Sequence, residues 1–136
     1  MAGRGLELQK AIFAALSQDA ALTALTDGPR VFDRVPANTP FPYVTFGRTS
    51  LYDWSTGTES GVEQLFSLHV WSKAQGKAET LAILERIAAL LDDRPLPLEG
   101  AALVSMRLEF SEVRYDDDLA VHHGLARLRA LVETTG

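Results

Sequence analysis

The residues with the most obvious potential for chemistry are three histidines and a run of acids. The run Asp116–Asp118 is followed closely by His122 and His123, while His69 lies in an earlier apolar segment. Carboxylates and imidazoles together bind several divalent metals. Three adjacent aspartates are, however, typical of a solvated turn, and adjacent residues of a strand point to opposite faces. We therefore expect neither a metal site nor a cofactor.

No arrangement of a nucleophile and a base stands out. Ser72 follows His69 by three positions, and in a strand this spacing puts the two side chains on opposite faces. Glutamates such as Glu99, Glu109 and Glu112 could act as acids or bases, but nothing singles out a pair. The chain contains no cysteine, no G-x-S-x-G elbow and no phosphate-binding glycine loop. We expect the protein not to be an enzyme.

Composition predicts one ordinary globular domain spanning residues 1–136. The chain has 136 residues, 46% of them hydrophobic and 23% charged, which suits a single buried core. Its formal net charge of −5 disfavours independent binding to nucleic acid, because that affinity depends on cations meeting phosphates. Mild acidity keeps a small domain soluble; it would also let the wall of a pore repel DNA.

Neither membrane insertion nor export is expected. No window approaches 18 consecutive apolar residues, so no transmembrane helix is available. The start, Met1–Gly5, leads directly into a helix-like pattern and lacks the apolar segment of a signal peptide. We expect synthesis in the cytoplasm.

Apolar spacing predicts an α+β fold. Helical periodicity appears at 6–16 and 76–91, and Asp19 can cap a second short helix. Alternating patterns predict strands at 31–35, 41–49, 63–72, 103–113 and 121–132. These elements favour a mainly antiparallel, twisted sheet of about four to five strands, with two main helices packed on one face.

The strand patterns also predict how the sheet faces are used. The expected helix-covered face carries Phe66, Leu68, Val70, Val104, Met106, Leu108 and Phe110. The opposite face mixes Leu65, Trp71 and Leu125 with polar side chains, which favours a subunit interface there. Gly124 lies inside a strand and indicates either a bulge or a close approach by another segment.

Two polar connections carry aromatic residues. The first, 50–61, is expected to be a long loop and contains Tyr52 and Trp54. Trp54 either folds back over its own sheet or inserts into a neighbouring subunit, where tryptophan is enriched. The second is an expected turn at 114–120.

An ordered set of short segments gives the chain a family resemblance. The segments are Leu8-Gln9-Lys10-Ala11-Ile12, Asp19-Ala20-Ala21-Leu22-Thr23, Val31-Phe32-Asp33-Arg34-Val35-Pro36, Phe41-Pro42-Tyr43-Val44-Thr45, Asp53-Trp54-Ser55-Thr56, Leu68-His69-Val70-Trp71-Ser72 and His123-Gly124. In this order and spacing the chain resembles the tail-completion or tail-terminator (head-tail joining) proteins of long-tailed bacteriophages and phage-like particles, such as gene transfer agents. The resemblance covers nearly the whole chain.

The resemblance implies a structural virion protein. Such proteins form a ring, usually hexameric, on the head-proximal end of the tail tube, where they end tube polymerisation. The implied partners are further copies of the chain, the tail tube protein and a neck or head-completion protein. DNA would pass through the lumen without sequence-specific binding, and no membrane is involved. The protein would thus reside in a virion or phage-like particle after synthesis in the bacterial cytoplasm.

Position between strands suggests which residues touch those partners. The candidate contact residues are Tyr52, Asp53, Trp54, Thr56, Arg114, Tyr115, Asp116, Asp117 and Asp118. Three alternatives remain: a neck protein that joins connector to tail without length control, a cellular α+β module that binds a ligand or peptide, and an enzyme.

Overall fold

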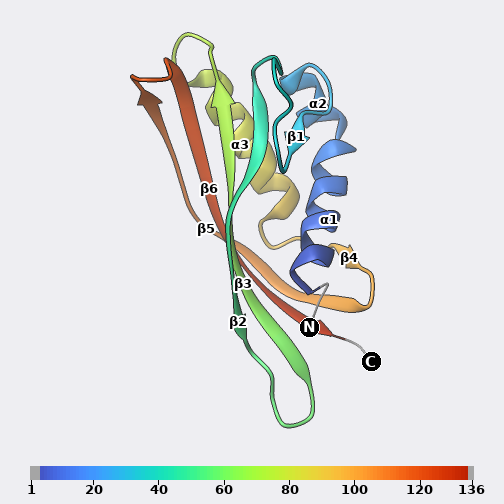
Figure 1. Cartoon of the computed structure of the whole chain (residues 1–136). Helices are drawn as coiled ribbons and strands as arrows, with labels where there is room; N and C mark the ends of the chain where they lie inside the picture. Colours follow the sequence, from blue (N-terminus) through green and yellow to red (C-terminus); the bar gives the residue numbers. More distant parts are fainter. Residues whose placement is uncertain (1–3, 135–136) are drawn as a thin grey trace.

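A computed structural model describes residues 4–134 and places three helices on one side of a six-stranded sheet (Figure 1). The helices are α1 (Arg4–Ser17), α2 (Ala20–Thr26) and α3 (Ala78–Leu91). The strands are β1 (Val31–Phe32), β2 (Tyr43–Asp53), β3 (Ser60–Ser72), β4 (Pro97–Leu98), β5 (Ala101–Asp116) and β6 (Val121–Thr134). Met1–Gly3, on which the expectation about export rests, lie outside the described residues. None of the described helices is long and apolar enough to span a membrane.

The α+β class is confirmed, while the expected count of four to five strands needs correction. The sheet has six strands in the order β1-β2-β3-β6-β5-β4, and it is mixed because β1 pairs parallel with β2. The unexpected strand is β4, whose two residues pair with Ala101 and Ala102 around Gly100 at φ 70°. The prolines at 95 and 97 indicate the end of a helix, and the sequence therefore does not predict this short edge strand. The two main helices are α1 and α3, and the short α2 is the helix expected after Asp19.

The core lies between the helices and one face of the sheet. Phe66, Leu68 and Val70 of β3 point into it, as their alternation predicts, and are at most 3% exposed. The helices contribute apolar residues four positions apart, a spacing that aligns side chains along one helical face. These residues are Leu8, Ile12 and Leu16 of α1, and Ile83, Ile87 and Leu91 of α3.

The predicted facing of β5 is wrong at Val104 and Phe110. Both side chains are largely exposed, at 48% and 43%, whereas Met106 is buried. The register of β5 against β6 shifts between Leu103 and Ser105 and again between Leu108 and Phe110. A β-bulge of this kind adds one residue to a strand and reverses the faces that follow. Because simple alternation cannot reveal bulges, it predicts the wrong face for Val104 and Phe110.

Gly124 allows a close approach and does not form a bulge. It pairs in continuous register with Val70 on β3 and Val113 on β5. A Cβ atom at this position would lie 2.7 Å from Thr80 Cγ2 and 3.1 Å from Leu84 Cδ1 of α3. The missing side chain therefore lets α3 sit directly on the sheet.

Asp19 fixes the start of α2, as the sequence predicts. Its carboxylate accepts a hydrogen bond from the Leu22 N–H at 2.8 Å, which is the expected N-cap contact. The same carboxylate accepts two hydrogen bonds from the Arg86 guanidinium of α3, at 2.7 and 2.8 Å. These Arg86 contacts are the main cause of an Asp19 pKa below its usual value.

We expect Asp19→Ala to lower the free energy of unfolding by about 1–2 kcal/mol, because it removes the cap and leaves Arg86 without its partner. Urea unfolding followed by circular dichroism measures this change. Asp19→Asn keeps an N-cap acceptor but loses the charge. Its free energy of unfolding is therefore expected to lie between those of the wild type and Asp19→Ala. If Asp19→Ala unfolds at the same urea concentration as the wild type, the cap has no stabilising role.

Candidate functional site

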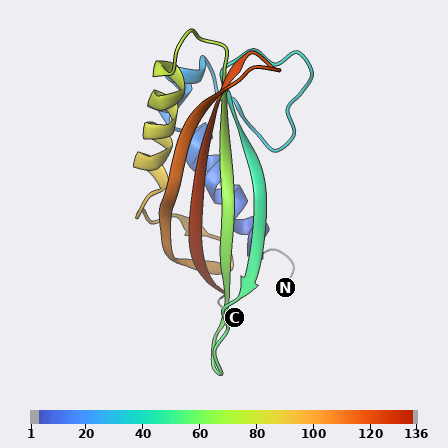
Figure 2. The ribbon, with the colours of Figure 1, turned by 90° about the vertical axis from the view of Figure 1, so that its left-hand side faces the viewer.

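Two β-hairpins extend from opposite ends of the sheet (Figures 1 and 2). The β2–β3 hairpin closes next to Ser60, whose partner on β6 is Thr134, and the β5–β6 hairpin closes next to Ser72, whose partner is His122. Strand β3 has 13 residues between these ends, a length of about 40 Å at the usual rise per residue. The two groups of candidate contact residues are therefore separated and cannot bind one small ligand together.

The expected long loop at 50–61 is instead the end of a β-hairpin. Strand β2 continues through Asp53 and β3 begins at Ser60. The tip is closed by hydrogen bonds from the Trp54 N–H to the Gly61 carbonyl (2.9 Å) and from the Thr56 N–H to the Glu59 carbonyl (2.8 Å). The polar residues that suggest a loop satisfy one another across this tip, so the segment is ordered and projects as a narrow arm.

Trp54 folds back against its own hairpin. A Cβ atom at Gly61 would lie 2.7 Å from Trp54 Cε3, so the ring covers this glycine. The side chain is still 38% exposed, and the neighbouring Tyr52 and Leu51 are each 53% exposed. The first of the two expectations for Trp54 is confirmed, and a contact of its exposed part with another subunit stays a prediction.

The second group of candidates belongs mainly to a strand. Arg114 and Tyr115 lie within β5, and the turn itself is restricted to residues 117–120. Asp116 accepts a hydrogen bond from the Leu119 N–H at 3.0 Å, which holds the turn. Asp117 and Asp118 are exposed to solvent. Among residues 4–134, no three side chains of the His, Cys, Asp or Glu types converge as a metal site would require.

A histidine–tryptophan cluster occupies the open face, which we define as the sheet face opposite the helices. His69 Nδ1 lies 2.7 Å from His123 Nε2, so one ring donates a hydrogen bond to the other. The Trp71 ring stacks on His123 with centroids 4.1 Å apart, and its Nε1–H donates to Thr45 Oγ1 at 3.0 Å. His122 points elsewhere and contacts Tyr115, as expected for adjacent strand residues. The sequence alone does not predict this cluster, because the cluster depends on the pairing register of β3 with β6.

Burial lowers the pKa of both clustered histidines. For His69, desolvation is the largest cause and the nearby charge of His123 adds to it. For His123, desolvation again leads, and the positive charge of Arg114 acts in the same direction. Asp116 and Glu112 oppose these effects on His123. The folded protein therefore favours uncharged imidazoles at this place.

The free energy of unfolding is expected to fall as the solution becomes acidic. A histidine with a lowered pKa binds fewer protons when folded than when unfolded, so its stabilising effect is complete above the unfolded value of about 6.5 and is lost as pH falls through the folded value. Thermal melts between about pH 7.5 and pH 5 measure this dependence. We expect His123→Gln to reduce the slope, with His122→Gln as the matched control. If His123→Gln leaves the pH dependence of the free energy of unfolding unchanged, this dependence does not come from the clustered histidines.

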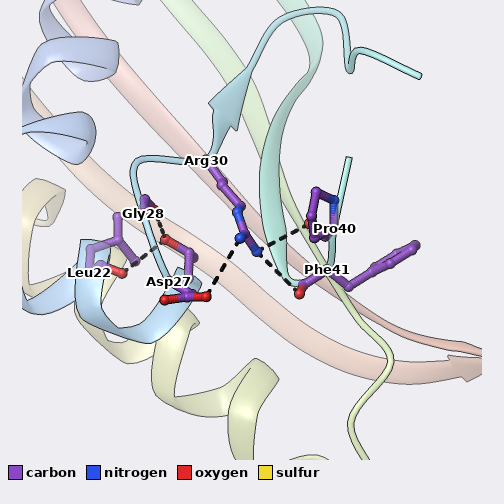
Figure 3. Close-up of polar contacts among 7 residues, drawn as sticks. Leu22, Asp27, Gly28, Arg30, Pro40 and Phe41 are labelled. Carbon is purple, nitrogen blue, oxygen red and sulfur yellow. Dashed lines mark hydrogen bonds and ion pairs between the residues drawn. The ribbon is translucent and has the colours of Figure 1, made fainter. Parts of the chain in front are cut away.

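A groove of about 550 Å³ lies beside this cluster, at the β5–β6 end of the sheet. Its lining is mainly apolar and includes Val35, Phe41, Tyr43, Trp71, Leu119 and Val121. One wall is the segment between β1 and β2, which Arg30 holds in place. Its guanidinium donates to the carbonyl oxygens of Pro40 and Phe41, each at 3.3 Å, and forms an ion pair with Asp27 (Figure 3). The groove is thus a preformed apolar surface near the acidic turn.

Comparisons with known proteins match nearly the whole chain. A family model described as "Tail completion protein gp17" matches residues 10–133. A chain in the solved structure "Virion of native gene transfer agent (GTA) particle" is similar over 98% of this chain and 99% of its own length, with 28% sequence identity and a TM-score of 0.87. No curated protein sequence matches significantly.

Proposed function

Because the chain belongs to the tail completion protein gp17 family, we propose that it caps the head-proximal end of a tail tube in a phage-like particle. The observation that carries this proposal is the full-length likeness to a chain of a gene transfer agent virion, which leaves no large insertion or missing element to support a different role. In this role the protein ends polymerisation of the tube and provides the joint to the head.

The shape of the molecule suits a position between two partners. Its hairpins project from opposite ends of one sheet, so one end can contact the tail tube protein while the other contacts a neck protein (Figure 2). We assign Tyr52 and Trp54 to one contact and the acidic turn Asp116–Asp118 to the other. A ring needs two different complementary surfaces on each copy, and a sheet with an open face and two edges can supply them.

A ring of six copies around a DNA channel also agrees with the charge of the chain. The net charge of −5 opposes tight binding of the DNA backbone, which must slide through the lumen. The role requires no catalysis and no cofactor, and we propose that the protein is not an enzyme.

Deletion of the gene tests this function. Particles from the deletion strain should be compared with the parent by electron microscopy, with a plasmid copy of the gene as the control. We expect abnormally long tubes if the protein ends polymerisation, or tails of normal length without heads if it only joins them. The second phenotype would favour a neck protein. Normal, fully assembled particles would contradict both roles.

A further inference from the structure

Both edges of the sheet contain long stretches without a partner strand in the described part of the chain. Strand β1 covers only Val44 and Thr45, so residues 46–52 of β2 have no partner strand on their outer side among the described residues. At the other edge, β4 covers only Ala101 and Ala102. Exposed strand edges present free N–H and C=O groups and are places where another strand can add.

The end of α3 narrows the free part of the β5 edge. The Asp93 N–H donates to the Met106 carbonyl, and Asp92 accepts from the Leu108 N–H, both at 2.8 Å. Beyond this point, residues 109–116 have no neighbouring strand on that side among the described residues. The stretches without a partner strand are therefore 46–52 on β2 and 109–116 on β5, although Ser111 and Glu112 also line a hollow beside α3.

The side chains beside the two free stretches have complementary charges. Arg48 lies within the register shift of β2 and is exposed, and Glu109 and Glu112 are exposed on β5. None of these three residues takes part in an ion pair among the described residues. Arg48 also lines, with Arg127, a hollow of about 280 Å³ that could receive a carboxylate. The β2 edge thus offers an unmatched positive charge, while the β5 edge, where Glu109, Glu112 and Asp116 outnumber Arg114, carries a net negative charge.

We propose that the β2 edge of one copy pairs with the β5 edge of the next, with Arg48 facing Glu112. This interface deepens the proposed ring and rests on that function. In the sheet, β2 and β5 run in opposite directions, because each strand from β2 through β3 and β6 to β5 is antiparallel to the next. Rotation about an axis to which the strands are only tilted preserves these directions, so the new pair is antiparallel.

The pairing requires neighbouring copies to be offset along the strands. Glu112 pairs with Leu125 on β6, Leu125 pairs with His69 on β3, and His69 pairs with Thr45 on β2. Glu112 and Thr45 therefore lie at the same height along the strands. Bringing Glu112 opposite Arg48 shifts the next copy by roughly three residues, on the order of 10 Å. Closed arrangements of strands have such an offset because their strands tilt relative to the axis. The alternative is that bulges and charges on these edges only prevent association.

Cysteine cross-linking in assembled particles separates these possibilities. The chain has no cysteine of its own, so every disulfide in an Arg48→Cys/Glu112→Cys variant involves the introduced residues. Within one copy the two positions are three strand spacings apart across the sheet, about 14 Å, and three residues apart along it, about 10 Å, which is too far for a disulfide. The two single variants are the matched controls. After mild oxidation and a non-reducing gel, we expect a ladder of oligomers from the double variant and monomers from the single variants.

The outcomes distinguish the interface from the function. If the double variant is present in particles but stays monomeric, the edge pairing is wrong while the proposed function stands. If the wild-type chain is absent from particles, the proposed function fails.

Charge reversal keeps the test decisive if the cysteine variants do not assemble. We expect Arg48→Glu to lower incorporation by about tenfold or more, since like charges would face each other. Adding Glu112→Arg to the same chain should restore incorporation. The control is Lys77→Glu, which reverses an exposed charge at the start of α3 and should have no comparable effect. Absence of restoration would overturn the pairing.

Discussion

Gly124→Val is expected to lower the free energy of unfolding by about 2–3 kcal/mol, because the added carbons enter occupied space. The Cβ alone would lie 2.7 Å from Thr80 Cγ2, 3.1 Å from Leu84 Cδ1 and 3.2 Å from Val70 Cβ. The side chain can be accommodated only if α3 moves away from the sheet. Since natural domains are stable by about 5–15 kcal/mol, the loss is a large part of the total.

Equilibrium unfolding in urea measures this loss. Gly57→Ala is the matched control, because a Cβ at Gly57 in the β2–β3 tip meets nothing within 4 Å. We expect the control to unfold at nearly the wild-type urea concentration. Equal midpoints for Gly124→Val and the wild type would mean that α3 does not rest on the sheet at this point.

Changes at the two hairpin ends are expected to block assembly at two different contacts. Trp54→Ala removes an exposed aromatic anchor, and such residues often contribute about 2 kcal/mol or more to an interface, roughly a 30-fold change in the binding constant. Asp117→Lys with Asp118→Lys reverses the charge of the opposite end and preserves Asp116, which holds the turn through the Leu119 N–H. We expect each variant to reduce the number of joined particles severalfold or more.

Particle counts by electron microscopy and thermal melts of the purified variants should be made together. Because Trp54 also covers Gly61, its loss is expected to loosen the hairpin tip; Tyr52→Ala, which changes an exposed ring at the same end, serves as the companion variant. Joined particles at wild-type numbers for all of these folded variants would show that neither end makes the assigned contacts.

Local patterns in the sequence predict the parts of the fold that depend on local physics. Helix α3 and the alternating faces of β3 follow from apolar spacing, and the Asp19 cap follows from residue type and position. Gly124 signals a special requirement, although the sequence alone leaves a bulge and a close approach equally possible. In each of these cases a few neighbouring residues determine the result.

Features that depend on strand pairing are not predictable in this way. The bulges in β5 move Val104 and Phe110 to the open face, and only the register against β6 reveals them. His69 and His123 are 54 positions apart and meet only because β3 and β6 pair. The candidate contact residues are found at two ends of the sheet for the same reason.

Electron cryo-microscopy of the joint between head and tail in purified particles tests the central claim most directly. The account predicts a closed ring of this 14.8 kDa chain between the tail tube and the neck, with one hairpin directed toward each. The copies should be related by rotation about the tube axis. A joint region fully occupied by other proteins, with this chain elsewhere or absent from the particle, would contradict it.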